Sequence, residues 1–186
     1  MRIKIFVLLC LTAIMQFTGV TPLKASHYYY KQLSLKDGVT SAVRCILTDK
    51  QGFVWIGTKA GISRYDGHEL KKYVYSPNNP HSIPNNLIHQ IAEDEMSNIW
   101  ILTDKGIARY QRQSDDFFLP TDEKGNPIIA YSTCLTKDGV LFGSKDKVYF
   151  YSYRDSSLRL LQKLNKGNNF NISLLSLWNE HTVLCC

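Results

Sequence analysis

The chain has 186 residues, of which 12% are aromatic and 20% are charged, and its formal net charge is +6 at pH 7. This length suits one domain with its own core, and the composition excludes an intrinsically disordered chain and a coiled coil. The basic residues form no concentrated cluster, so a nucleic-acid interface is excluded as well.

Residues 1–26 have the pattern of a signal peptide. Arg2 and Lys4 give a cationic start, residues 5–17 are mostly apolar, and cleavage is expected near Ala25. The apolar run of about 13 residues is short for a membrane span, and a retained N-terminal membrane helix is the alternative. Cleavage leaves 19 basic and 16 acidic residues, a net charge of +3. The mature chain is therefore expected in the periplasm.

A repeat with a period of 45 residues follows: the segment Val43–Tyr65 recurs without a gap as Ile88–Tyr110. The identical pairs include Asp49 and Asp94, Trp55 and Trp100, Thr58 and Thr103, Gly61 and Gly106, Arg64 and Arg109, and Tyr65 and Tyr110. A third, weaker copy extends from about Leu135 to Tyr151, and a fourth begins near Ile172. The mature chain thus holds about 3.5 repeats.

Each repeat contains four short apolar runs separated by turn residues, which predicts a four-stranded antiparallel sheet. In the first copy the expected strands are 43–48, 53–58, 62–65 and 70–75. Asp49 and Gly52 occupy the first turn, where the carboxylate can accept hydrogen bonds from backbone amides and the glycine supplies a positive φ. A sheet of this kind repeated about every 45 residues is typical of a β-propeller blade.

The predicted fold class is therefore all-β: a partial β-propeller of four-stranded antiparallel blades, preceded by a signal-peptide helix. No helical periodicity of useful length follows residue 26. Residues 28–35 are expected to form an extra lead-in strand. The blades are expected at 40–75, 86–119 and 130–163, with the start of a fourth at 170–186.

Residues 49–67 read Asp-x-x-Gly-x-x-Trp-Ile-Gly-Thr-x-x-Gly-Ile-x-Arg-Tyr-Asp-Gly. This pattern resembles the two-component regulator propeller repeat, and its place after a signal peptide resembles the start of the hybrid two-component sensors of Bacteroidetes. The resemblance implies a full-length protein in the inner membrane, with two seven-bladed periplasmic propellers and a histidine kinase. It also implies a homodimer that detects glycan-derived oligosaccharides and signals by phosphorelay.

The chain also departs from that pattern. The second copy has Ser97 in place of Gly52 and Leu102 in place of Gly57, and the third copy lacks the tryptophan. Only about half of one propeller is present, so we expect a fragment of a longer reading frame, whose remaining blades or a second chain cover its open sheets. An incomplete ring predicts a sugar affinity weaker than about 1 mM for this chain alone.

The sequence indicates no catalytic residue, no cofactor and no assignable ligand-binding residue. Asp49 and Asp94 recur as turn residues, so their repetition needs no catalytic role. Arg64 and Arg109 recur as blade residues, and for these two a ligand-binding role is the less favoured alternative. A propeller enzyme of the lyase or glycosidase type would need polar residues that converge from the innermost strands, and a non-catalytic interaction scaffold is a further alternative. The inner-strand candidates form no acid–base set: Arg44, His89 and Cys134.

Metal-type spacing is not evident either. The acidic pairs 115–116 and 122–123 lack a calcium-loop pattern, and the histidines are not spaced with carboxylates or cysteines as ligands. These histidines are His27, His68, His81, His89 and His181. Cys45 and Cys134 are interpreted as small buried side chains, while the disulfide state of these two and of Cys185 and Cys186 is left open.

Overall fold

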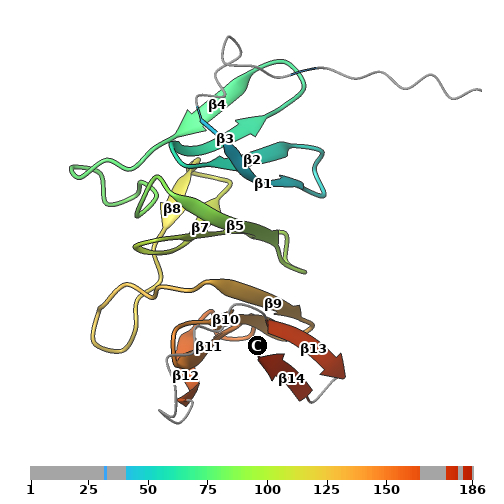
Figure 1. The fold of residues 1–186 in the computed structure, drawn as a ribbon, viewed down its shortest axis with the longest axis vertical. Coiled ribbons are helices and arrows are strands. Elements are labelled where there is room, and N and C mark those ends of the chain that lie inside the picture. Colours follow the sequence, from blue (N-terminus) through green and yellow to red (C-terminus); the bar gives the residue numbers. More distant parts are fainter. Residues whose placement is uncertain (1–31, 33–40, 164–174, 180–181, 186) are drawn as a thin grey trace, which may run out of the picture. The chain divides into compact units, whose positions relative to one another are not determined.

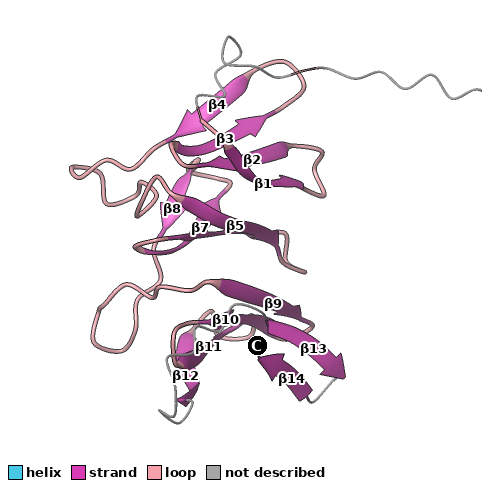
Figure 2. Ribbon diagram, viewed as in Figure 1, coloured by secondary structure: helices cyan, strands magenta, loops and turns pink. Residues whose placement is uncertain are grey.

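A computed structural model of the chain describes residue 32 and residues 41–163, 175–179 and 182–185. The predicted signal peptide lies outside these residues, and so does the predicted lead-in strand at 28–35 except for residue 32, which is in no strand. The chain divides into two compact units, Met1–Gln32 and Leu33–Cys186, and the sheets belong to the second. Every regular element of the described part is a β-strand (Figures 1 and 2), so it contains no helix that could cross a membrane.

Three four-stranded antiparallel sheets and one hairpin follow one another along the chain, with the strands of each sheet paired in chain order. The first sheet contains β1 (Val43–Thr48), β2 (Val54–Thr58), β3 (Gly61–Tyr65) and β4 (Leu70–Tyr73). The second contains β5 (Ile88–Glu93), β6 (Ile99–Thr103), β7 (Gly106–Gln111) and β8 (Asp116–Phe118). The third contains β9 (Ser132–Thr136), β10 (Gly139–Gly143), β11 (Lys147–Ser152) and β12 (Leu158–Lys163). The hairpin pairs β13 (Leu175–Asn179) with β14 (Thr182–Cys185), and the all-β, blade-type fold is confirmed.

The first two sheets have the same register. Trp55 on β2 lies opposite Arg64 on β3, as Trp100 on β6 lies opposite Arg109 on β7. An irregularity in the pairing also recurs near the start of both β1 and β5. The 45-residue period of the sequence is therefore also a period of the backbone pairing.

The third sheet keeps the strand order but loses the motif. Leu141 takes the tryptophan position and lies opposite Phe150, which takes the arginine position. The first turn holds only residues 137–138, between Thr136 and Gly139, whereas the first two sheets have five-residue turns at 49–53 and 94–98. The tryptophan and the aspartate turn are thus lost together.

Successive side chains of a strand point to opposite faces, so each sheet contributes to the core on both sides. The core between the first and second sheets includes the fully buried Trp55, Ile62, Ile88, Ile99 and Ile101. The core between the second and third sheets includes Trp100, Leu102, Ile107, Phe142 and Tyr151. A smaller cluster of Cys134, Leu141 and Val148 lies on the other face of the third sheet, where β13 contacts β9 and β10. The sheets are therefore held together by apolar contact between faces.

Each sheet has two ends with different connections. The turn end carries the β1–β2 and β3–β4 turns and their equivalents, and the linker end carries the β2–β3 turns and the linkers 74–87 and 119–131. Each linker is tied to a neighbouring turn, because the Gly61 amide donates to Asn86 O (2.8 Å) and the Ile107 amide donates to Ile128 O (2.9 Å). Gly61 has φ +113°, and a Cβ there would lie 2.5 Å from Tyr73 O, so only glycine fits.

Three strand boundaries of the first sheet differ from the expected ones: β3 begins at Gly61 and not at Ile62, and the other two differ for local reasons. Strand β4 ends at Tyr73 and not at Tyr75, because the Tyr75 amide donates to the Asn86 side chain of the linker (2.7 Å). Strand β2 begins at Val54 and not at Phe53, because the Phe53 amide donates to the turn carboxylate of Asp49 (2.9 Å).

Candidate functional site

An aspartate closes the first turn of the first sheet. Asp49 Oδ1 accepts hydrogen bonds from the amides of Gln51 (3.0 Å) and Phe53 (2.9 Å), and its Oδ2 accepts one from Trp55 Nε1 (2.9 Å). Gly52 supplies the left-handed backbone of this turn, with φ +88°. The carboxylate is therefore bonded both to its own turn and to the tryptophan of the core.

The second sheet repeats this turn with the aspartate kept and a serine at the glycine position. Asp94 accepts hydrogen bonds from the Asn98 amide (2.8 Å) and from Trp100 Nε1 (2.8 Å), and it is 1% exposed. Ser97 stands at the glycine position and still adopts φ +61°, a conformation that a non-glycine residue adopts at some cost. Both turn aspartates are thus part of the sheet framework.

The motif arginine of the first sheet contacts the second sheet. The Arg64 guanidinium donates to the Tyr110 hydroxyl and lies 4.9 Å from the centre of the Phe53 ring and 5.9 Å from that of Trp55. The Trp55 and Tyr110 rings are also in edge contact, with centroids 4.8 Å apart. Arg64 and Trp55 together therefore join their sheet to a tyrosine of the next one.

The same joint recurs between the second and third sheets. Arg109 donates to the Tyr151 hydroxyl, and the Trp100 and Tyr151 rings have centroids 4.8 Å apart in edge contact. Tyr65, which corresponds to Tyr110 in the first sheet, donates its hydroxyl to Gly67 O. The repeated arginines thus lie within sheet-to-sheet joints.

The two threonines of the motif close the β2–β3 and β6–β7 turns. Thr58 Oγ1 donates to Gly61 O (2.9 Å), and Thr103 Oγ1 donates to Gly106 O (2.7 Å). Gly57 has a different role, since a Cβ there would come within 2.7 Å of Ile88 on the second sheet. Cys45 of its own sheet would lie 2.5 Å from the same Cβ, so a side chain at this position would crowd both sheets.

Asp115 gathers four polar side chains at the turn end of the first joint. Its carboxylate accepts hydrogen bonds from the hydroxyls of Tyr73 (2.6 Å) and Tyr110, and it pairs with Arg64 (3.2 Å) and Lys71. Burial opposes ionisation, but the bonds from Lys71 and the two tyrosines outweigh it and lower the pKa of Asp115 to about 2. The group is therefore a carboxylate at neutral pH.

Arg112 adds a second set of charged contacts to the same joint, at the turn of the first sheet. It donates to Asp49 Oδ2 (3.1 Å), to Gln51 Oε1 (2.8 Å) and to Ser97 O (3.2 Å). Burial would raise the pKa of Asp49, but the bonds from Trp55 and the Phe53 amide and the nearby Arg112 leave it below its usual value. Arg112 was not predicted from the sequence, and Asp115 was considered only as a member of the acidic pair 115–116, because neither residue belongs to the repeated motif.

The inner-strand candidates for an enzyme lie in three different surroundings. Arg44 is exposed on β1, and Cys134 is 8% exposed in an apolar cluster with Leu141. His89 Nε2 lies within hydrogen-bonding distance of Asp104 Oδ1. Among the residues that the structure describes, no group of three or more His, Cys, Asp or Glu side chains could hold a metal ion.

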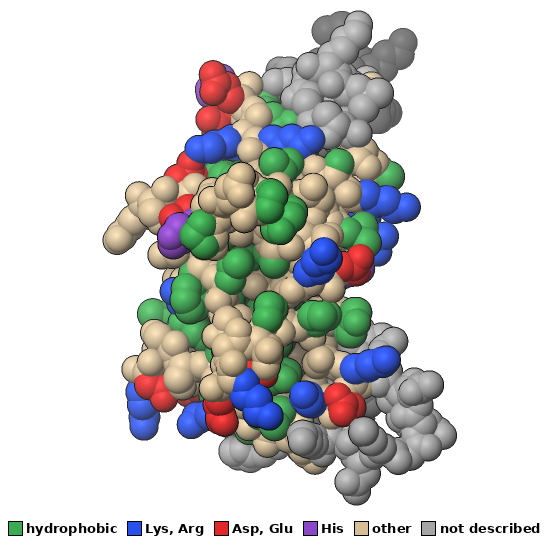
Figure 3. All heavy atoms as spheres, turned by 90° about the vertical axis from the view of Figure 1, so that its left-hand side faces the viewer, with side chains coloured by type: hydrophobic (Ala, Val, Ile, Leu, Met, Phe, Trp, Pro, Cys, Tyr) green, Lys and Arg blue, Asp and Glu red, His purple; other side chains and the backbone are tan. Residues whose placement is uncertain are grey.

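The remaining candidates of the sequence analysis are placed only in part. Neither Cys45 nor Cys134 forms a disulfide bond; Cys134 is buried as expected, whereas Cys45 is only half-buried, and burial raises the pKa of Cys45. His27, His181 and Cys186 lie outside the described residues. Lys and Arg side chains lie among Asp and Glu side chains on the face drawn in Figure 3.

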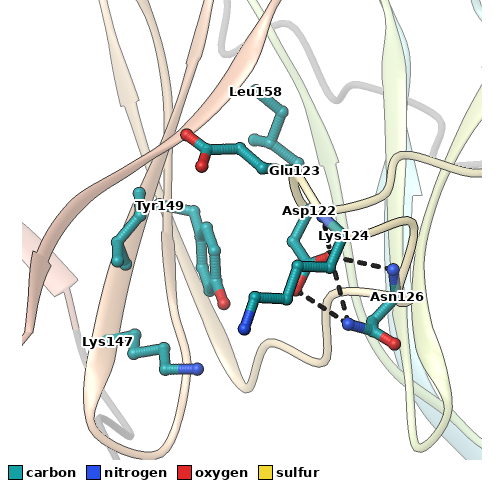
Figure 4. A pocket seen from close by; sticks show the side chains of 8 residues that line it. Asp122, Glu123, Lys124, Asn126, Lys147, Tyr149 and Leu158 are labelled. Carbon is teal, nitrogen blue, oxygen red and sulfur yellow. Dashed lines mark hydrogen bonds between the residues drawn. The ribbon is translucent and has the colours of Figure 1, made fainter.

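A hollow of about 290 Å³ lies at the linker end, between the 119–131 linker and the third sheet (Figure 4). It combines two lysines, two carboxylates, an amide, a tyrosine and two leucines. These residues are Asp122, Glu123, Lys124, Asn126, Lys147, Tyr149, Leu158 and Leu160. Except for the acidic pair 122–123, these residues could not be singled out from the sequence, because they come from a linker and from two strands of the third, weaker copy.

Comparison with known proteins shows what this architecture resembles. Residues 37–60 match the family described as the two component regulator propeller. Over 59 residues the chain is 37% identical to the histidine kinase P4 of Formosa agariphila, a stretch that covers 31% of this chain and 4% of that protein.

Solved structures that share the fold include the following two. The extracellular domain of a hybrid two component system from B. thetaiotaomicron is 22% identical with a TM-score of 0.59, covering 82% of this chain and 19% of that one. A virginiamycin B lyase from Staphylococcus aureus is 13% identical with a TM-score of 0.51, covering 85% of this chain and 51% of that one. The chain spans about a fifth or less of the length of the histidine kinase P4 and of the B. thetaiotaomicron domain. The resemblance drawn from residues 49–67 is confirmed: the chain carries the two-component regulator propeller repeat, on a fold that it shares with the extracellular domain of a hybrid two component system.

Proposed function

We propose that this chain is a segment of the sensor propeller of a two-component histidine-kinase regulator and detects glycan-derived oligosaccharides outside the cytoplasm. The observation that carries the proposal is the match of residues 37–60 to the two component regulator propeller, which includes the Asp49 turn and the Trp55 bonded to it. The fold shared with the extracellular domain from B. thetaiotaomicron supports it. A fold alone does not specify a ligand, so the oligosaccharide comes from the family resemblance.

The proposed location is the periplasm after cleavage near Ala25, with the full-length sensor in the inner membrane. A fusion of residues 1–40 to a reporter that is active only outside the cytoplasm tests this location. We expect reporter activity and a mature N-terminus close to Ser26. Activity lost on removal of residues 1–26 would agree with this, whereas an unprocessed cytoplasmic reporter would contradict it.

A further propeller blade is the proposed partner of the first sheet, either from a longer polypeptide or from a second chain. Val43 is 46% and Ile46 63% exposed, whereas the corresponding Ile88 and Ile91 are 0% and 8% exposed. Because those two are covered by the preceding sheet, a similar blade fits against the first. Ile46→Asp should change the unfolding free energy of this chain by less than about 0.5 kcal/mol but destabilise a polypeptide with the additional blade. Equal effects in both would contradict the proposal.

The lyase-type fold of one solved neighbour keeps a propeller enzyme as the second candidate. Incubation of the chain with a panel of glycan-derived oligosaccharides, followed by product analysis, separates the candidates. The sensor proposal predicts unchanged sugars and reversible binding, weaker than about 1 mM for this chain and tighter when the remaining blades are present. Product formation would favour the enzyme, and failure of the longer polypeptide to bind would favour an interaction scaffold.

A further inference from the structure

The hollow at the linker end holds two cationic side chains that take no part in the joints between sheets. Lys124 extends from the linker and Lys147 from the start of β11, and Tyr149 follows Lys147 on the same face of that strand. Figure 4 shows both ammonium groups and the Tyr149 hydroxyl directed toward one part of the hollow. Three hydrogen-bond donors therefore converge from two separate segments.

The two carboxylates of the hollow do not fill this part of it. Asp122 is bonded within its own turn, where its Oδ1 accepts hydrogen bonds from the amides of Asn126 (2.8 Å) and Lys124 (2.9 Å). The bond from the Asn126 amide is the main cause of a lowered pKa for Asp122. The Glu123 carboxylate is directed away from the two ammonium groups (Figure 4). The hollow thus has a donor side and an acceptor side.

We propose that this hollow binds one acidic sugar unit. The carboxylate or sulfate of the sugar accepts hydrogen bonds from Lys124, Lys147 and Tyr149, which are stronger than bonds between neutral groups because they are charge-assisted. The Glu123 carboxylate accepts hydrogen bonds from sugar hydroxyls, and Leu158 supplies an apolar wall for the ring. A hollow of about 290 Å³ is at the lower limit of ligand pockets, which suits one sugar unit and not a chain.

That the anionic group belongs to a sugar rests on the proposed function. That the donor side of the hollow recognises an anion does not depend on the proposed function. Lys124 is exposed and Lys147 half-buried, so water and salt compete for them and binding is expected to be weaker than about 1 mM. The method must therefore detect weak binding residue by residue. Amide chemical shifts of the ¹⁵N-labelled full chain, followed by NMR at constant ionic strength, meet this need.

The titration uses glucuronate, glucose 6-sulfate, glucose, acetate and inorganic sulfate. We expect the two acidic sugars to shift the amides of Lys124, Lys147 and Tyr149, with glucose, acetate and sulfate binding roughly tenfold more weakly. Comparison of glucuronate with glucose 6-sulfate shows which acidic group is preferred. Lys147→Gln should weaken binding of the preferred sugar roughly tenfold, and Lys145→Gln, a nearby exposed lysine outside the hollow, should leave it unchanged.

Specific results would overturn the inference. Equal binding of glucose and glucuronate would remove the anion as the recognised group, and equal effects of Lys147→Gln and Lys145→Gln would place the site elsewhere. Equal binding of acetate or sulfate and the acidic sugars would show that no sugar is recognised. None of these results bears on the oligosaccharide panel with the longer polypeptide, so failure here and failure of the proposed function are distinguishable.

Discussion

The joint between the first and second sheets and the joint between the second and third share one part and differ in another. Both contain a tryptophan in edge contact with a tyrosine of the next sheet, at the same centroid distance of 4.8 Å. Arg112 and Asp115 add a charged network to the first joint. At the second joint Tyr153 and Ser156 stand at the corresponding positions, and the Tyr153 hydroxyl has no hydrogen-bond partner among the described residues.

This comparison distinguishes the contacts that the repeated motif makes at both joints from the contacts that occur at the first joint only. The packed rings and the arginine–tyrosine contact come with every full copy of the repeat. The charged network depends on residues outside the motif, so we expect it to be specific to one joint. In repeat proteins stability is approximately the sum of terms for each unit and each contact between neighbours, and these two contributions can therefore be measured separately.

The largest expected effect tests the shared part. Trp55→Ala and Trp100→Ala should each lower the unfolding free energy by about 3–5 kcal/mol, because both side chains are fully buried between two sheets. Urea denaturation followed by circular dichroism measures this change, with Met96→Ala, at an exposed position, as the control. Clearly different costs for the two substitutions would show that the joints are not equivalent.

The next effect tests the aspartate turn. In Asp94→Asn the side-chain amide meets either the Trp100 indole N–H or the turn amides, so one buried donor loses its acceptor. We expect a loss of about 1–3 kcal/mol in the same denaturation experiment. Asp138→Asn, in the short exposed turn of the third sheet, should change little. If Asp94→Asn left the unfolding free energy unchanged, the turn would tolerate the loss of its carboxylate.

A smaller effect tests the charged network through pH. Because the pKa of Asp115 is lowered to about 2 from an ordinary 3.8, the carboxylate stabilises the folded chain above about pH 4. This contribution is lost as the pH falls toward 2. The difference in unfolding free energy between the wild type and Asp115→Asn should therefore be largest at neutral pH and shrink below about pH 4. A difference independent of pH would show that the carboxylate charge is not what matters.

The smallest effect compares the two aspartate turns directly. Ser97→Gly should stabilise the chain by up to about 1 kcal/mol, because φ +61° costs a serine more than a glycine. Gly52→Ser in the first sheet should be destabilising by a similar amount. Thermal unfolding of the two variants measures both changes, and effects of the same sign would contradict the equivalence of the turns.

The sequence was sufficient to predict the sheets and their motif. A repeat without gaps implies equal strand pairing, and Asp49 with Trp55 recurs at the same spacing as Asp94 with Trp100 because each pair shares a hydrogen bond. The third copy loses both members of the pair, which the structure explains by the shorter turn before Leu141. Local chemistry and periodicity were enough at these positions.

Other features could not be predicted, because they join residues that are distant in the sequence and occur in one copy. Arg112 and Asp49 are 63 residues apart and bond across two sheets. The hollow brings Lys124 of a linker to Lys147 of the third sheet, and no repeat marks either residue. Such contacts depend on how sheets pack, which single-residue patterns do not reveal.

The tyrosine shared between neighbouring sheets has a consequence for how such arrays evolve. A duplicated unit of 45 residues carries the tryptophan–arginine half of one joint and the tyrosine half of another, wherever in the period the duplication begins. Whole copies can therefore be added or lost, and each new contact between neighbouring sheets still has a tryptophan–arginine pair on one side and a tyrosine on the other. Substitutions that compensate one another should accordingly pair residues of successive copies, such as Arg64 with Tyr110, 46 positions apart, and not residues within one copy.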